Sequence, residues 1–275
     1  RNTCGTEIVY RVGVTRTSIL VRELDPATNA FQEVVRFNPS EDDIPEAYSR
    51  VVLLANTRMR VAASEGSTSW QVVEALKSID VLSGDILKVP AEGSLAPDSY
   101  EIRTGDLRVD ILSKMARAQE RRLAEVWATR DDTTPVKTLE ELLILASIIE
   151  KETGVSDERF QVASVFANRL NKGMPLQTDP TVIYGITLGK GPLGRGLRKS
   201  ELRRDTPWNT YVNRGLPPTP IANPGLASLQ AAVAPTETDY IFFVADGTGG
   251  HAFAVTLKDH NRNVAAWRKI EAERN

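Results

Sequence analysis

The chain has 275 residues, with 34 basic side chains against 36 acidic ones and a formal net charge of −2. This near balance argues against a nucleic-acid-binding protein, which usually carries a basic excess. A single cysteine, Cys4, excludes a disulfide framework and a cysteine-based zinc cluster. The longest apolar run is far shorter than the roughly 20 residues that cross a bilayer. Because the chain starts at Arg1 and not at methionine, we expect that a signal or anchor precedes it.

The N-terminal segment 1–57 alternates apolar and polar positions as strands do. We expect strands within 8–14, 19–24 and 31–37, separated by turn residues, and a further buried strand at 51–55. The segment is therefore predicted to be rich in β-structure.

A small mixed module is predicted over residues 58–104. Its helix is WQVVEALKSI, where apolar residues recur at helical spacing. Strands are expected at MRVAA (59–63), ILKV (86–89) and SYEI (99–102). A long amphipathic helix at 106–129 then fills most of a connecting segment, 105–134.

The last unit, 135–275, is first rich in helix and then dense in Gly, Pro and Asn. The predicted fold class is therefore α+β, with small β-rich modules joined by a helix to a mixed domain with long loops. A helix is expected at 139–153, with Thr138 and Glu141 as a capping box and Gly154 as the C-cap. A second helix is expected at about 156–172.

Glu150 ends the apolar run LLILASIIEKE and shares a helix face with Leu143 and Ala146. A carboxyl group in an apolar site should have a raised pKa, which suits a general acid near neutral pH. Glu152 is expected about 200° further round the helix, looking outward. The alternative is that Glu150 simply ends the helix and pairs with an arginine such as Arg169.

The polar loops that follow carry amide, carboxylate and hydroxyl groups together with aromatic rings, which is typical of a carbohydrate pocket. These residues are Gln177, Asp179, Thr181, Tyr184, Trp208, Asn209, Tyr211 and Asn223. For any one of them alone, the alternative is a hydrogen bond that stabilises a loop. Residues 174–185 and 206–225 are expected to be ordered loops, and the basic stretch between them is expected to be a mobile flap beside a cleft.

A β-hairpin is predicted around Asp246–Gly250, with His251 opening its second strand. His251 is expected to donate a hydrogen bond in the pocket or in the hairpin. No metal-ligand spacing surrounds the two histidines, so no metal site is predicted.

Five motifs in order, LASIIEKET, VFANRL, GMPLQTDPTVIYG, TPWNTYVNRGLPPTPIANPG and GGHAFAVTLKDHN, resemble the endolytic peptidoglycan transglycosylases of the YceG-like (MltG) family. EGSLAPDSY resembles that family's segment between a LysM-like module and the catalytic part. The resemblance covers about residues 60–270. Trp208 stands where the family usually has a tyrosine, and an aromatic ring there keeps a stacking face.

The resemblance implies a LysM-like module at 58–104 and a YceG-like catalytic domain at 135–275. It implies a lytic enzyme that cleaves the β-1,4 bond between N-acetylmuramic acid and N-acetylglucosamine in nascent glycan strands, leaving 1,6-anhydro ends. The implied location is the bacterial inner membrane, with a single-pass anchor outside this chain and the catalytic part in the periplasm or facing the cell wall. Implied partners are glycan strands and peptidoglycan synthases, with no nucleic acid, cofactor or metal.

The implied catalytic residue is Glu150, which would give a proton to the glycosidic oxygen and then take one from the C6 hydroxyl of the muramic sugar. The implied substrate-binding residues are Asn168, Gln177, Asp179, Thr181, Tyr184, Trp208, Asn209, Tyr211, Asn223 and His251. Two alternatives remain open. One is a muramidase-type hydrolase in which Asp179 is the second carboxylate, and the other is a glycan-binding scaffold without catalytic activity.

Overall fold

The computed structural model describes residues 10–14, 19–25, 30–37, 59–130 and 134–274. Contacts divide the chain into two compact units: Arg1–Arg60 with Glu101–Asp106, and Val61–Tyr100 with Leu107–Asn275. The four-part division expected from the sequence, with boundaries after residues 57, 104 and 134, stays a prediction.

The first unit contains a three-stranded antiparallel sheet in the order β1-β2-β3. Its strands are β1 (Tyr10–Val14), β2 (Ile19–Asp25) and β3 (Ala30–Phe37), with an irregularity between Val21 and Arg22. The predicted β-structure of this part is thereby confirmed for three strands. The further strand expected at 51–55 lies outside the described residues.

The two-stranded sheet of β4 (Met59–Ala62) and β5 (Ser99–Ile102) accompanies helix α2 (Ser69–Lys77). Thr68 caps α2, accepting a hydrogen bond from the Gln71 backbone while the Gln71 side chain accepts one from Thr68. The strand predicted at 86–89 is wrong. Leu87 there is 97% exposed, and the segment is bracketed by Gly84 and Pro90, which interrupt regular structure.

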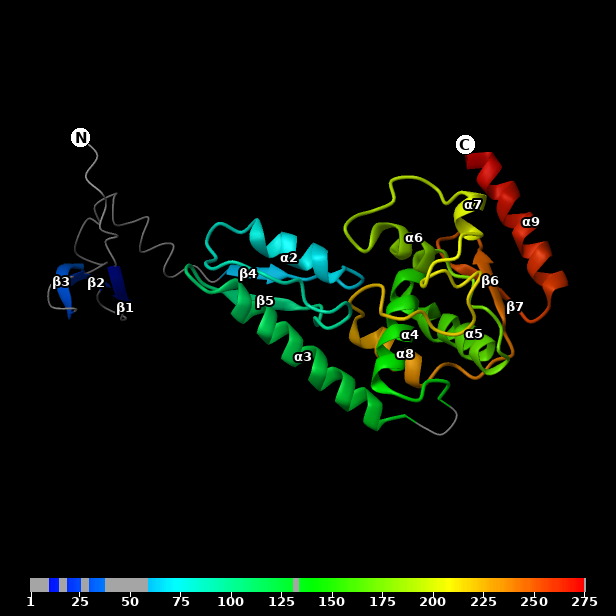
Figure 1. The fold of residues 1–275 in the computed structure, drawn as a ribbon, viewed down its shortest axis with the longest axis horizontal. Coiled ribbons are helices and arrows are strands. Elements are labelled where there is room, and N and C mark those ends of the chain that lie inside the picture. The colour runs from blue at the N-terminus through cyan, green and yellow to red at the C-terminus, as the bar shows by residue number, and fades with distance from the viewer. Residues whose placement is uncertain (1–9, 15–18, 26–29, 38–58, 131–133, 275) are drawn as a thin grey trace. The chain divides into compact units, whose positions relative to one another are not determined.

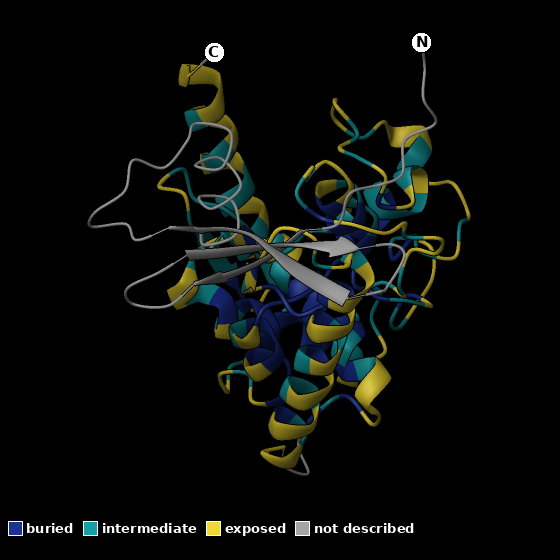
Figure 2. Ribbon diagram, turned by 90° about the vertical axis from the view of Figure 1, so that its left-hand side faces the viewer, coloured by how far each residue is buried: buried dark blue, intermediate teal, exposed yellow. Residues whose placement is uncertain are grey.

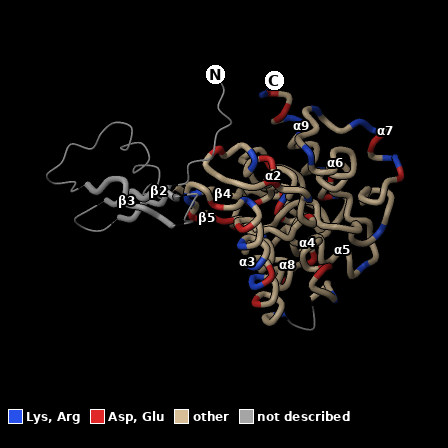
Figure 3. Tube along the Cα trace, turned by 60° about the vertical axis from the view of Figure 1, so that its left-hand side comes forward, with Lys and Arg blue, Asp and Glu red and all other residues tan. Residues whose placement is uncertain are grey.

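Helix α3 (Arg108–Ala128) confirms the predicted amphipathic helix. Ile111 and Met115 lie fully buried on its inner face, and Val126 nearly so. Lys, Arg, Asp and Glu alternate over much of the rest of the helix (Figure 3). Arg122 ties the helix to the preceding segment, donating to the backbone oxygen of Pro97 and the carboxylate of Asp98.

The remaining helices form the larger part of the second unit (Figure 1). They are α4 (Leu139–Glu152), a short 3-10 turn at Ser156–Glu158, α5 (Arg159–Asn171), α6 (Asp179–Thr187), α7 (Lys199–Leu202), α8 (Leu226–Val233) and α9 (Leu257–Arg274). Helices α4 and α8 pack together at the centre, where the buried segments gather in Figure 2. Leu142, Leu145, Phe166 and Leu229 are among the buried side chains of this core.

The ends of the helices show which boundaries the local sequence predicted correctly. Thr138 caps α4 by accepting a hydrogen bond from the Glu141 backbone, as predicted, but the reciprocal half of the predicted capping box is wrong, because the Glu141 side chain accepts from the Lys137 backbone. Gly154 is not the C-cap, because α4 ends at Thr153 in extended backbone geometry. The prediction of a loop at 174–185 is wrong for its second half, which belongs to the helix α6; this helix carries Pro180 in its first turn, where a missing N–H is harmless.

The hairpin of β6 (Phe242–Ala245) and β7 (His251–Ala254) confirms the predicted hairpin and the place of His251. The described fold is a mixed α+β fold, mostly helical with small sheets, so the predicted α+β class is confirmed. Within the described residues, none of the helices has the length and apolar character needed to span a membrane.

Asn223 joins the 61–100 segment to the helical core. Its side chain accepts a hydrogen bond from the Leu95 backbone and donates to the Ser67 carbonyl and the Ser69 hydroxyl. Its own backbone exchanges hydrogen bonds with Gly66 and Ser67. Since Asn223 is only 1% exposed, these partners replace water completely.

Candidate active site

A cavity of about 320 Å³ opens where the last turn of α4 meets the start of α6 and the β6 strand. It is lined by Glu152, Arg169, Leu176, Gln177, Asp179, Tyr211, Phe243 and Val244. Two carboxylates, a guanidinium, an amide and a phenol thus meet against apolar walls, which is the usual construction of a ligand site. Within the described residues, no cluster of His, Cys, Asp and Glu is suited to a metal ion.

Glu152 is the most perturbed acid of this cavity. Burial raises the pKa of its carboxyl group, and the negative charge of Asp179 raises it further. The Thr178 hydroxyl, which donates a hydrogen bond to Glu152, and the nearby His251 act in the opposite direction without cancelling the rise. The expectation that Glu152 looks outward is wrong, because the loop before α6 covers that side of α4.

Asp179 and Tyr211 form a second pair in the cavity. The Tyr211 hydroxyl donates to Asp179 Oδ1 at 2.6 Å. Burial and this hydrogen bond raise the pKa of Tyr211 above its usual value, so the phenol keeps its proton. Asp179 lies in the first turn of α6, where the helix dipole favours a carboxylate.

Arg169 is a nearly buried cation at the back of the cavity, 7% exposed. Its Nε donates to the Ile241 carbonyl at 2.7 Å, and its Nη1 donates to the Leu176 carbonyl and to Gln177 Oε1. Burial lowers the pKa of the guanidinium from its very high usual value. Gln177 takes a left-handed backbone conformation, with φ of 53°, a strain of the kind found at functional sites.

Glu150 occupies a different environment. Its Oε2 accepts hydrogen bonds from the Gly225 backbone at 2.9 Å and the Ser228 hydroxyl at 2.7 Å, at the start of α8. Its Oε1 lies 3.9 Å from Arg159 Nη2, and both side chains are less than a tenth exposed. Glu150 is therefore buried as predicted, but its site is polar, not apolar, and the nearby arginine is Arg159 and not Arg169.

Of the residues predicted to bind substrate, Gln177, Asp179 and Tyr211 lie together in the cavity. Other residues predicted to bind substrate are buried and form hydrogen bonds within the protein. Asn209 is fully buried, and its amide donates to three backbone carbonyls between residues 201 and 204. Thr181 and Asn223 are likewise buried and hydrogen-bonded.

Asn168, Tyr184, Trp208 and His251 have partners of their own. Asn168 donates to the carbonyls of residues 238 and 240, which holds the segment before β6 on α5. Tyr184 and Trp208 pack against each other, with ring centres 5.7 Å apart. The His251 ring is hydrogen-bonded to Glu158 at 2.8 Å and packs edge-on to Phe243, which lines the cavity.

Sequence reasoning missed Glu152 and Arg169 as members of the site. Glu152 stands in the same EKET motif as Glu150, and helical periodicity alone favoured the acid on the more apolar face. The signal that could have identified Glu152 is its closeness in space to the QTDP segment, which depends on tertiary packing.

Comparison with known proteins gives consistent results. The YceG-like family model matches residues 39–266. The chain is 40% identical over 187 residues to a Bacillus subtilis protein named endolytic murein transglycosylase, covering 66% of this chain and 51% of that protein. It is 30% identical over 231 residues to the protein of the same name from Streptococcus pneumoniae D39, covering 82% of this chain and 40% of that protein. The chain thus spans about half the length, or less, of these relatives.

A crystal structure of a yceG-like protein from Listeria monocytogenes has the same fold. It superposes with a TM-score of 0.62 at 30% sequence identity, covering 82% of this chain and 83% of that one.

Proposed function

Because the chain belongs to the YceG-like family, we propose that it is an endolytic murein transglycosylase in which Glu152 carries the chemistry. The observation that carries the assignment of Glu152 is its buried carboxyl group, with a raised pKa, in the wall of a cavity that also holds Asp179, Tyr211 and Arg169. The sequence prediction had placed this role on Glu150.

In the first step, protonated Glu152 donates its proton to the glycosidic oxygen between N-acetylmuramic acid and N-acetylglucosamine. The C–O bond breaks as positive charge develops on the muramic sugar. A carboxyl group kept protonated by burial is suited to this task, because it can still donate near neutral pH.

In the second step, the Glu152 carboxylate takes the proton of the C6 hydroxyl of the same sugar, whose oxygen attacks C1. A 1,6-anhydro ring forms, and Glu152 returns to its starting state. Because the nucleophile belongs to the sugar itself, much of the entropic cost of orientation is already met. No water molecule needs activation, so a single carboxyl group is sufficient.

Glu150 does not offer this chemistry in the arrangement described. Its Oε2 is occupied by two donors from the start of α8, and Arg159 lies beside its Oε1. It is also absent from the residues that line the cavity of Glu152. We propose that Glu150 is a structural carboxylate that holds α8 on α4.

The test is a matched pair of variants, Glu152→Gln and Glu150→Gln, assayed on isolated glycan strands. Glu152→Gln removes the transferable proton with little change in shape, so cleavage should fall by about 10²–10⁴-fold. Glu150→Gln should retain cleavage to the extent that it stays folded, as checked by circular dichroism. Loss of activity in Glu150→Gln alone, with Glu152→Gln active, would return the acid role to Glu150.

A second candidate function is a muramidase-type hydrolysis, which Asp179 supports because it lines the same cavity as Glu152. Mass spectrometry of the products separates the two reactions. Anhydro ends that persist in Asp179→Asn support the transglycosylase, whereas reducible ends that depend on Asp179 support the hydrolase. Strand binding without any cleavage would support a glycan-binding scaffold.

The substrate also suggests a location. Murein lies outside the cytoplasmic membrane, so we propose that this part of the protein works on the outer side of that membrane, held there by an anchor outside this chain. Peptidoglycan synthases are proposed as partners because they produce the nascent strands. Protease protection in intact spheroplasts tests the location, and crosslinking in growing cells tests the partners.

A further inference from the structure

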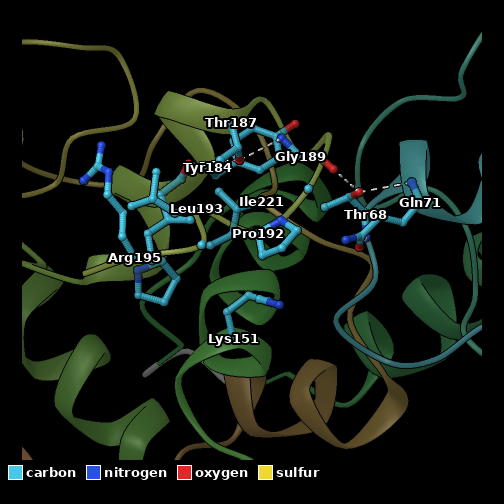
Figure 4. Close-up of a pocket in the computed structure, with 14 residues that line it drawn as sticks. Thr68, Gln71, Lys151, Tyr184, Thr187, Gly189, Pro192, Leu193, Arg195 and Ile221 are labelled. Carbon is cyan, nitrogen blue, oxygen red and sulfur yellow. Dashed lines mark hydrogen bonds between the residues drawn. The ribbon is translucent and has the colours of Figure 1, made fainter. Parts of the chain in front are cut away.

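A second cavity, of about 390 Å³, is lined by Lys151 near the end of α4, by residues of α6 and by the loop that follows α6 (Figure 4). Apolar side chains form much of its wall, including Ile183, Tyr184, Leu193 and Ile221. The loop 189–195 contributes to one side, and the Thr68 hydroxyl, from the start of α2, donates to the Gly189 carbonyl at 2.6 Å and holds that loop in place.

Two cations line this second cavity, and they differ in their partners. Arg195 forms a two-pronged ion pair with Glu201, at 2.6 and 2.9 Å, so its charge is matched. Lys151 is exposed; among the described residues its Nζ donates to the Gly66 carbonyl, at 3.2 Å, and forms no ion pair. An ammonium group has three donors, so Lys151 can still bind an anionic group in the cavity.

The two cavities are adjacent along the chain at two places. Lys151 lines the second cavity and Glu152 lines the first, and in the same way Pro180 lines the second and Asp179 the first. Consecutive Cα atoms are about 3.8 Å apart, so the two sites are on the order of 10 Å from each other. An extended peptide covers that distance with about three residues, at roughly 3.3–3.6 Å each.

We propose that the second cavity binds the peptide substituent carried by the muramic sugars of the strand. A peptide carboxylate would pair with Lys151 Nζ, and the apolar parts of the peptide would pack on Ile183, Tyr184 and Leu193. A strand without peptides presents only the lactyl carboxylate attached directly to each muramic sugar, whereas a stem peptide carries several carboxylates that reach further from the sugar ring. This inference rests on the proposed function, because it takes the substrate to be a murein strand cut at Glu152.

The experiment compares strands that carry stem peptides with strands stripped of them by an amidase. The full chain is assayed as wild type, Lys151→Met, Lys151→Arg and Lys190→Met. Lys190 is the matched control, because it is exposed like Lys151 and belongs to the loop 189–195, yet its side chain does not line the cavity. Losing a charged hydrogen bond in a partly enclosed site corresponds to about a tenfold change in binding.

We expect the wild type to cut peptide-bearing strands with a kcat/KM about tenfold above that for stripped strands. Lys151→Met should reduce this ratio to near 1, through a higher KM on peptide-bearing strands. Lys151→Arg and Lys190→Met should keep most of the preference. Equal rates on both substrates in the wild type, or equal losses on both in Lys151→Met, would overturn the proposal.

A binding measurement separates this inference from the proposed function. If the wild type cut neither strand, the proposed function would fail, yet a soluble muramyl tripeptide could still be titrated into the protein by calorimetry. A Kd about tenfold weaker in Lys151→Met than in Lys190→Met would support the peptide site. No binding of that peptide to the wild type at millimolar concentration would refute it.

Discussion

Replacing Glu150 by alanine should destabilise the protein strongly, because this carboxylate joins two helices inside the core. Its Oε2 accepts from the Gly225 backbone and the Ser228 hydroxyl, and α8 has no side-chain cap of its own at Gly225. Arg159, only 9% exposed at its side chain, has this carboxylate as its ion-pair partner. The Nε of Arg159 already lacks a hydrogen-bond partner among the described residues, so this guanidinium depends on the Glu150 carboxylate.

The size of the effect follows from these contacts. Each hydrogen bond to a charged group contributes about 1.5–3 kcal/mol, and removing one member of a buried pair costs about 3–5 kcal/mol. The 3.9 Å separation from Arg159 is long, so its loss adds little beyond the two hydrogen bonds. We expect Glu150→Ala to lower the free energy of unfolding by about 3–5 kcal/mol, which is roughly 10 °C in Tm for a domain of this size.

The assay is urea unfolding followed by circular dichroism, with Glu140→Ala as the control. Glu140 is on the same helix but exposed, so its loss should cost less than about 1 kcal/mol. Glu150→Gln keeps an acceptor oxygen, so its loss in free energy of unfolding should lie between the losses of Glu140→Ala and Glu150→Ala. If Glu150→Ala unfolded like the control, the carboxylate would not hold α8, and the structural role assigned to it would be refuted.

Two further predictions address the site and the junction. Cleavage should fall as the pH rises through the pKa of Glu152, because only the protonated carboxyl group donates. Thr178→Val removes a hydrogen bond that lowers this pKa and should move the alkaline limb of the kcat/KM profile to higher pH, whereas Asp179→Asn removes a charge that raises the pKa and should move that limb to lower pH. A shift in the same direction in both variants would contradict the assignment. Asn223→Ala leaves the Leu95 N–H without its acceptor, at about 1–3 kcal/mol, whereas the Ser67 carbonyl keeps its hydrogen bond from the backbone of residue 223. The substitution should expose residues 61–100 to limited proteolysis before the helical core, and uniform cleavage would contradict that order.

Local signals predicted much of this fold. The N-cap signal at Thr138 located the start of α4, and the apolar spacing of α3 identified its buried face, because both depend on residues a few positions apart. Helix α6 was missed because Asp179 and Pro180 are typical of turns as well as of a first helical turn.

The candidate site was predicted in part. Gln177, Asp179 and Tyr211 were expected to lie together and do, but the acid was assigned to Glu150. Periodicity shows which face of α4 is buried, yet it does not show which neighbours cover that face. The start of α8 supplies donors to Glu150, and the loop before α6 encloses Glu152, and both contacts join residues far apart in sequence.

The adjacency of Lys151 and Glu152 on α4 has a mechanical consequence. The Cα atoms of two consecutive residues are held about 3.8 Å apart by the peptide bond, and the helix fixes the directions of the two side chains relative to each other as long as its backbone hydrogen bonds persist. The distance between a peptide bound at Lys151 and the glycosidic bond cleaved at Glu152 would then be set by the covalent chain and would not depend on a hinge motion. A glycan strand that binds at successive positions would then be cleaved each time at the same distance from the bound peptide.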